Sequence, residues 1–171
     1  ETTLSVLWQP PHPAGNYSDY KVSIQPQDAD ISELLIPREG TPPGPAQAAF
    51  NGLVPGKLYN ISVASEGQVS EPSTAQYRTV PLRPHNGTIE NVGSNSLTVS
   101  WSAPQGISEF DRYQVAIRSR RKTPQIIGRG EKLEATVTDL QPNRTYTVVI
   151  KTVSCSVASW HGVINVTTSI V

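Results

Sequence analysis

The feature that most constrains the fold of this chain is a pattern of alternating apolar residues that occurs twice. Each half carries three triplets in which every second residue is aliphatic or aromatic. The triplets are Leu4, Val6 and Trp8, then Tyr20, Val22 and Ile24, then Tyr59, Ile61 and Val63 in the first half, and Leu97, Val99 and Trp101, then Tyr113, Val115 and Ile117, then Tyr146, Val148 and Ile150 in the second. A period of two places the side chains of a triplet on one face of a β-strand. The pattern therefore predicts half-buried strands and two copies of one fold.

The segments between the triplets favour tight turns over helices. The chain has 15 prolines and 12 glycines among 171 residues, and many of them form turn signals such as Pro-Gly-Lys and Gly-Arg-Gly. This spacing leaves no room for the crossover helices of a parallel sheet. We therefore predict an all-β chain of two seven-stranded antiparallel immunoglobulin-like β-sandwiches in tandem, over residues 1–81 and 82–171.

The two halves differ at their beginnings. The second half has enough residues before Trp101, around 83–89, for a first strand, whereas the first half begins only seven residues before Trp8. We expect the first sandwich to lack most of its first strand and to have an open sheet edge. We also expect the chain to be part of a longer protein.

The core is predicted to contain six aromatic residues at equivalent positions of the two halves: Trp8, Tyr20, Tyr59, Trp101, Tyr113 and Tyr146. The segments LVPGKLY and LQPNRTY each place a leucine six residues before a tyrosine, with a proline between them. A buried phenol needs a hydrogen-bond partner, and a chain corner before the strand can provide a backbone one. This is the arrangement of a tyrosine corner.

These residues resemble fibronectin type III repeats, and two such repeats cover nearly the whole chain. The segments LRPHNGTI, GISEFDRYQV and VIKTVS are further similar to the ectodomains of insect receptor-type tyrosine phosphatases, in the subgroup whose ectodomain contains only fibronectin type III repeats. The resemblance implies a ligand-binding or spacing segment of a single-pass type I membrane receptor, on the extracellular side of the plasma membrane. It also implies roles of the parent protein in axon guidance and epithelial tube formation, with the phosphatase in a cytoplasmic domain outside this chain.

Other classes of protein use the same modules. The main alternative is a cell-adhesion or matrix protein, although Arg-Gly-Asp is absent. A cytokine-type receptor lacks support because its cysteine pairs and Trp-Ser-X-Trp-Ser box are missing. An accessory module of a secreted glycosidase is a further alternative. The expected partner is a cell-surface or matrix protein.

The chain is expected to be extracellular because it contains five Asn-X-Ser/Thr sequons. They begin at Asn16, Asn60, Asn86, Asn143 and Asn165. The single cysteine, Cys155, excludes an internal disulfide and leaves either a free surface thiol or a bridge to another chain, which would make a homodimer possible.

The sequence predicts neither catalysis nor a cofactor or metal in this segment. Its three histidines are widely separated, and no set of residues has the spacing of metal ligands or of a phosphate-binding loop. A tyrosine phosphatase needs an arginine six positions after its cysteine, and His161 stands there instead.

Positive charge gathers in the second half, which holds 10 basic and 6 acidic residues, and suggests a binding surface. The predicted basic patch consists of Arg112, Arg118, Arg120, Arg121, Lys122 and Lys151. It could bind sulfated glycans or an acidic protein, and a solvated strand and loop is the plainer interpretation. Nucleic acid is excluded as a partner because no aromatic residues interleave with these cations. Trp160 is a candidate contact residue in a loop, with packing as the alternative.

Overall fold

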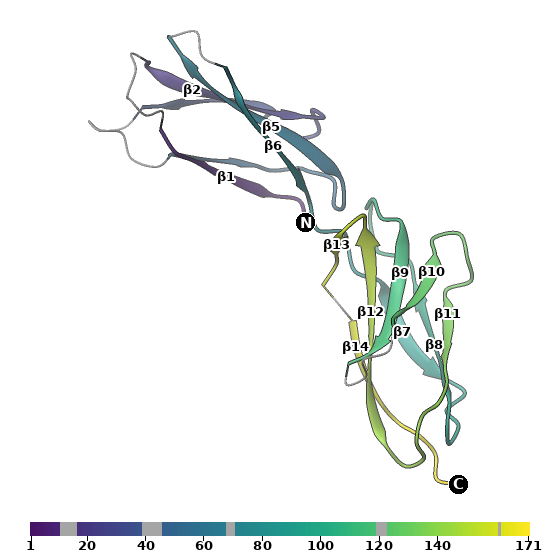
Figure 1. Ribbon diagram of the computed structural model, residues 1–171. Helices are drawn as coiled ribbons and strands as arrows, with labels where there is room; N and C mark the ends of the chain where they lie inside the picture. Colours follow the sequence, from purple (N-terminus) through teal and green to yellow (C-terminus); the bar gives the residue numbers. More distant parts are fainter. Residues whose placement is uncertain (11–16, 39–45, 68–70, 119–122, 161) are drawn as a thin grey trace. The chain divides into compact units, whose positions relative to one another are not determined.

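The computed structural model describes residues 1–10, 17–38, 46–67, 71–118, 123–160 and 162–171 (Figure 1). They form two compact units, Glu1–Thr79 and Val80–Val171. All strand pairs in the described residues are antiparallel. The predicted all-β fold with two sandwiches is therefore confirmed. In the described part, no helix is long and apolar enough to cross a membrane.

Unit 1 packs a sheet of two strands against a sheet of four. The smaller sheet pairs β1 (Leu4–Trp8) with β4 (Ala46–Phe50), and the larger has the order β3-β2-β5-β6. The strands of the larger sheet are β2 (Asp19–Gln25), β3 (Glu33–Pro37), β5 (Leu58–Glu66) and β6 (Ser73–Arg78). No strand of the described residues precedes β1, so the smaller sheet ends at β1.

Unit 2 repeats this arrangement with an additional first strand. Its smaller sheet has the order β11-β8-β7 and consists of β7 (His85–Glu90), β8 (Leu97–Ser102) and β11 (Glu134–Val137). Its larger sheet consists of β9 (Arg112–Ile117), β10 (Gln125–Gly128), β12 (Thr145–Ser154), β13 (Val157–Ala158) and β14 (Gly162–Thr167). Strand β12 lies between β9 and β14 and supplies the centre of the core.

Five of the six predicted core aromatics are buried in the structure: Tyr20, Tyr59, Trp101, Tyr113 and Tyr146. Trp8 differs, because it is only half-buried although it packs against the core of unit 1. Its equivalent, Trp101, is 5% exposed beneath a sheet that includes β7. The incomplete smaller sheet is thus the physical reason for the difference.

The corner before β5 and the corner before β12 are held by the same set of hydrogen bonds. The hydroxyl of Tyr59 accepts a bond of 2.8 Å from the backbone N–H of Val54, and that of Tyr146 accepts one of 2.9 Å from Gln141. A buried threonine completes each corner. Thr79 directly follows β6, and Thr168 directly follows β14. The Thr79 hydroxyl donates to the carbonyl of Val54 at 2.6 Å, and the Thr168 hydroxyl donates to that of Gln141 at 2.6 Å.

Replacing Thr79 with valine is expected to destabilise unit 1. The side chain is 5% exposed, and its hydroxyl also accepts a bond of 3.1 Å from the backbone N–H of Lys57. Valine would leave that N–H and the Val54 carbonyl without this partner, at a cost of about 1–3 kcal/mol. Urea unfolding followed by the amide NMR signals of unit 1 would measure the change, because Trp101 and Trp160 of unit 2 also contribute to tryptophan fluorescence. Thr74→Val, at an exposed position of β6, is the matched control and should change the stability by less than about 0.5 kcal/mol; equal effects of the two variants would contradict the assigned role of Thr79.

Candidate functional site

The described part of the predicted basic patch lies on the outer face of the larger sheet of unit 2. Arg112 and Lys151 lie on the neighbouring strands β9 and β12, where Val153 is paired with Arg112 and Lys151 with Gln114. Arg118 directly follows β9 and is exposed. Arg120, Arg121 and Lys122 lie outside the described residues. The outer face therefore carries cations from two adjacent strands.

Arg112 is engaged by neighbours that the sequence analysis did not identify. Its Nη1 atom lies 3.2 Å from Oδ2 of Asp111, and its Nη2 atom donates to the carbonyl of Cys155 at 3.2 Å. The same Asp111 oxygen accepts a bond of 2.7 Å from the backbone N–H of Cys155. Because the Asp111 carboxylate balances its charge, Arg112 contributes less to a positive surface than its position in the sequence suggests.

Asp111 and Arg112 fix the turn between β12 and β13 through their hydrogen bonds to the backbone of Cys155. Cys155 lies in this turn, is exposed, and has a φ of 54°. A positive φ is the conformation that tight hairpin turns require, and it is uncommon for residues other than glycine. The thiol is accessible, so the predicted choice between a free thiol and an intermolecular bridge stays open. Trp160 follows β13 and is 70% exposed, which leaves its ring available for contact.

Four of the five sequon asparagines are described, and all four are exposed: Asn60, Asn86, Asn143 and Asn165. Asn60 accepts a bond of 2.8 Å from Gln76, and Asn165 accepts one of 2.9 Å from Thr147 across the sheet. Asn16 lies outside the described residues. The exposed positions are compatible with glycosylation, which stays a prediction.

The described residues bring no catalytic or metal-binding set together. They contain no group of three or more His, Cys, Asp or Glu side chains that could hold a metal ion. His85 contacts Gln105, with 2.9 Å between His85 Nε2 and Gln105 Nε2, and the other two histidines lie outside the described residues.

Asp28, Lys57 and Tyr59 form a cluster in unit 1, in which the pKa values of Asp28 and Tyr59 are shifted. The Lys57 ammonium lies 2.8 Å from Oδ2 of Asp28, and the Tyr59 hydroxyl donates to the same oxygen at 2.9 Å. These two bonds, that from Lys57 first, hold the pKa of Asp28 below its usual value of 3.8. Burial, with the neighbouring Asp28 as a smaller cause, raises the pKa of Tyr59. Such shifts occur at active sites, but here each group already satisfies its neighbour, so the cluster is structural.

Acid is expected to weaken unit 1 through Asp28. Because its folded-state pKa lies below the unfolded value, the interaction stabilises the fold above about pH 4 and is lost as the pH falls through the folded-state pKa. Asp28→Asn should lower the thermal midpoint near neutral pH and have a smaller effect once the pH has fallen through the folded-state pKa of Asp28, where wild type also loses the charge. Thermal unfolding of wild type and Asp28→Asn at several pH values would measure these effects. A difference in thermal midpoint that stays constant as the pH falls would contradict the stabilising role of the Asp28 charge. Asp30→Asn, at an exposed neighbour, is the control.

Each unit is an antiparallel β-sandwich with a tyrosine at the corner before its central strand, and the described residues contain no disulfide. This architecture defines the class of immunoglobulin-like modules arranged in tandem. The sequence matches the fibronectin type III domain family over residues 1–78 and again over 82–164. The chain therefore belongs to the fibronectin type III family.

Similar proteins come from the extracellular matrix. The chain is 32% identical to tenascin-R of Mus musculus over 149 residues, which are 85% of the chain and 10% of that protein. It is 30% identical to the collagen alpha-1(XII) chain of Oryctolagus cuniculus over 109 residues, covering 61% of the chain and 16% of the relative. A solved two-domain fibronectin type III segment of chicken tenascin has a TM-score of 0.58 and 28% identity, with 98% of this chain and 93% of that chain covered.

The chain thus spans about a tenth of the length of tenascin-R. These relatives agree with the matrix or adhesion alternative better than with the receptor phosphatase that the sequence motifs suggested. The extracellular setting is supported by the tenascin relatives, whereas membrane anchoring is not.

Proposed function

We propose that this chain is a spacing and adhesive segment of an extracellular, multi-repeat protein of the matrix or cell-adhesion type. The observation that carries the proposal is the similarity to tenascin-R, which runs through both units and covers 85% of the chain. The exposed sequon asparagines support it, because glycans fit a surface that faces the extracellular space. In this proposal the segment catalyses no reaction. It holds its binding surfaces at a set position along the parent chain.

The outer face of β9 and β12 is the surface that we propose binds sulfated glycans. Arg118 is exposed and Lys151 is half-exposed, and both belong to the unit with the excess of basic residues. Sulfate groups attract such cations through charge, and salt screens the attraction. This binding is therefore electrostatic and strongest at low ionic strength.

Retention on a heparin column tests this surface. The double variant Arg118→Gln and Lys151→Gln should elute at lower salt than wild type, because it removes two cations from the proposed face. The matched control is the double variant Arg83→Gln and Lys132→Gln, which makes the same change in net charge. Both residues are exposed, and they precede β7 and β11, which belong to the smaller sheet of unit 2. The control should elute close to wild type; equal losses for the two double variants would show that net charge, and not this face, decides retention.

A second candidate function is the ectodomain segment of a receptor-type tyrosine phosphatase. The motifs LRPHNGTI, GISEFDRYQV and VIKTVS favour it. In this case the parent protein is anchored in the plasma membrane and binds a ligand on another cell.

The location of the full-length parent separates the two candidates. An antibody against this chain should detect a matrix protein in the culture medium and in the detergent-insoluble matrix. Recovery instead in membranes washed with alkaline carbonate, with phosphatase activity in the immunoprecipitate, would replace the matrix proposal with the receptor one. An irrelevant antibody of the same class is the control for the precipitated activity.

A further inference from the structure

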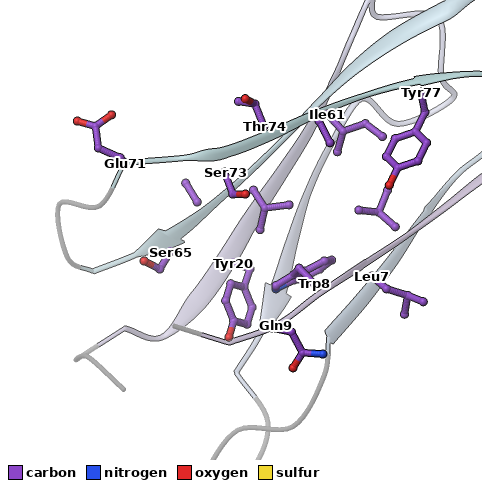
Figure 2. Close-up of a pocket in the computed structure, with 14 residues that line it drawn as sticks. Leu7, Trp8, Gln9, Tyr20, Ile61, Ser65, Glu71, Ser73, Thr74 and Tyr77 are labelled. Carbon is purple, nitrogen blue, oxygen red and sulfur yellow. The ribbon is translucent and has the colours of Figure 1, made fainter. Parts of the chain in front are cut away.

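Tyr20 and Tyr113 occupy equivalent positions in the two units. Figure 2 shows Tyr20 of β2 beside Trp8 of β1, and Tyr113 of β9 makes the same contact with Trp101 of β8. The two tyrosine side chains are 3% and 1% exposed, respectively. A buried phenol needs a hydrogen-bond partner, so both hydroxyls are expected to have one.

Within the described residues, the hydroxyl of Tyr20 has a partner and that of Tyr113 has none. Tyr17 lies three residues before Tyr20, and their hydroxyl oxygens are 2.8 Å apart. Phe110 takes the place of Tyr17 in unit 2, and the centroids of the Phe110 and Tyr113 rings are 5.1 Å apart. Phenylalanine has no hydroxyl, and no other residue of the described ranges bonds to the hydroxyl of Tyr113. This phenol therefore keeps an unused donor.

An arginine stacks on the first ring of each pair. Cζ of Arg38 lies 4.6 Å from the centre of the Tyr17 ring, and Cζ of Arg129 lies 4.5 Å from the centre of the Phe110 ring. Stacking uses the flat face of a guanidinium and leaves its N–H donors at the edge. No residue in the described part of the chain forms a hydrogen bond or an ion pair with Arg129. Burial raises the pKa of Tyr113 and the charge of Arg129 partly offsets this, so the guanidinium lies near the phenol.

Arg129 and Tyr113 both line an open cavity of about 560 Å³ at one end of unit 2. Its walls come from the segment between β8 and β9 and from the segment between β10 and β11. They also have an apolar part, which includes Leu133 and Ile107, and Ile107 is 84% exposed. Glu131 is the single acid among the described lining residues. Sites for small molecules have volumes of about 300–1,000 Å³ and combine apolar walls with a few polar groups in the same way.

We propose that this cavity binds a small carboxylic acid with an apolar body, in its ionised form. The guanidinium edge of Arg129 offers two parallel N–H donors, which match the two oxygens of a carboxylate. The Tyr113 hydroxyl donates a third bond, and the apolar body lies against Ile107 and Leu133. In unit 1 the equivalent phenol is already bonded to Tyr17, so the site belongs to unit 2. It adds a small ligand to the adhesive role proposed above.

Three small molecules test the proposal on residues 1–171. Phenylacetate has a carboxylate and an apolar ring, phenylacetamide has the same ring without the charge, and glucuronate has a carboxylate without an apolar body. Phenylacetate should bind at least about tenfold more tightly than either of the others, because it alone offers both charge-assisted bonds and apolar surface. Titrations followed by amide chemical shifts would give the affinities. The shifts should change within residues 103–113 and 129–133, which line the cavity.

The variant Phe110→Tyr separates lost binding from lost folding. It gives Tyr113 the hydroxyl partner that exists in unit 1, and so should weaken phenylacetate binding about fivefold while unit 2 stays at least as stable as in wild type. Arg129→Gln should weaken binding at least about tenfold through loss of the charged fork. Lys132→Gln is the matched control, because it removes the same charge from an exposed neighbour outside the cavity lining, and it should leave the affinity unchanged. Circular dichroism and urea unfolding would check the fold of each variant.

Three results would overturn the proposal. The first is that phenylacetate does not bind at millimolar concentration. The second is that phenylacetamide or glucuronate binds as tightly as phenylacetate, since the site would then not select a carboxylate on an apolar body. The third is that Phe110→Tyr and Arg129→Gln, while folded, bind phenylacetate as wild type does, because the ligand would then lie elsewhere.

Discussion

The packing of aromatic rings between two sheets is the interaction on which each unit depends. In unit 1, the rings of Trp8 on β1 and Tyr20 on β2 lie edge to face with centroids 5.2 Å apart. In unit 2, the centroids of Trp101 on β8 and Tyr113 on β9 are 5.5 Å apart. Stacked sheets lie about 10 Å apart, so large side chains are needed to fill the layer between them. Because the chain has one cysteine, no internal disulfide links the two sheets, and the packed side chains alone hold them together.

Because both sheets share one core, a change at the edge of one sheet affects the exposure of the other. Strand β7 belongs to the smaller sheet of unit 2, yet it helps to cover Ile164 and Ile150 in the larger sheet. Unit 1 has no such strand in its described residues, and Tyr77 on its larger sheet is half exposed. The inner face of a sheet is therefore buried only as far as the opposite sheet extends over it.

The sequence predicts most of the fold because a strand with one buried face has a local signature. The triplets located β1, β2 and β5 and their equivalents, since alternation requires no knowledge of distant residues. Thr79 and Thr168 had no such signature: each is a single polar residue whose partner lies 25 or 27 positions away. A comparison of the two repeats, which aligns these threonines, was the signal that could have found them.

The candidate surfaces were less predictable than the strands. Arg112 was identified as a surface cation from its position on a strand, but its carbonyl partner, Cys155, is 43 residues away and becomes a neighbour only through folding. Trp8 and Trp101 have the same local pattern, Leu-X-Val-X-Trp, yet different exposure. Local sequence determines which way a side chain faces, whereas the amount of surface that remains accessible depends on which other strands are present.

Duplication explains why the two units share a scaffold and still offer different surfaces. The residues that hold the scaffold are equivalent in both, as with Tyr59 and Tyr146 at the corners. Other positions differ between the units, as with Ala75 in the place of Ile164. A fold of this kind tolerates such differences because its stability resides in the shared interior, while strand edges and outer faces are free to change.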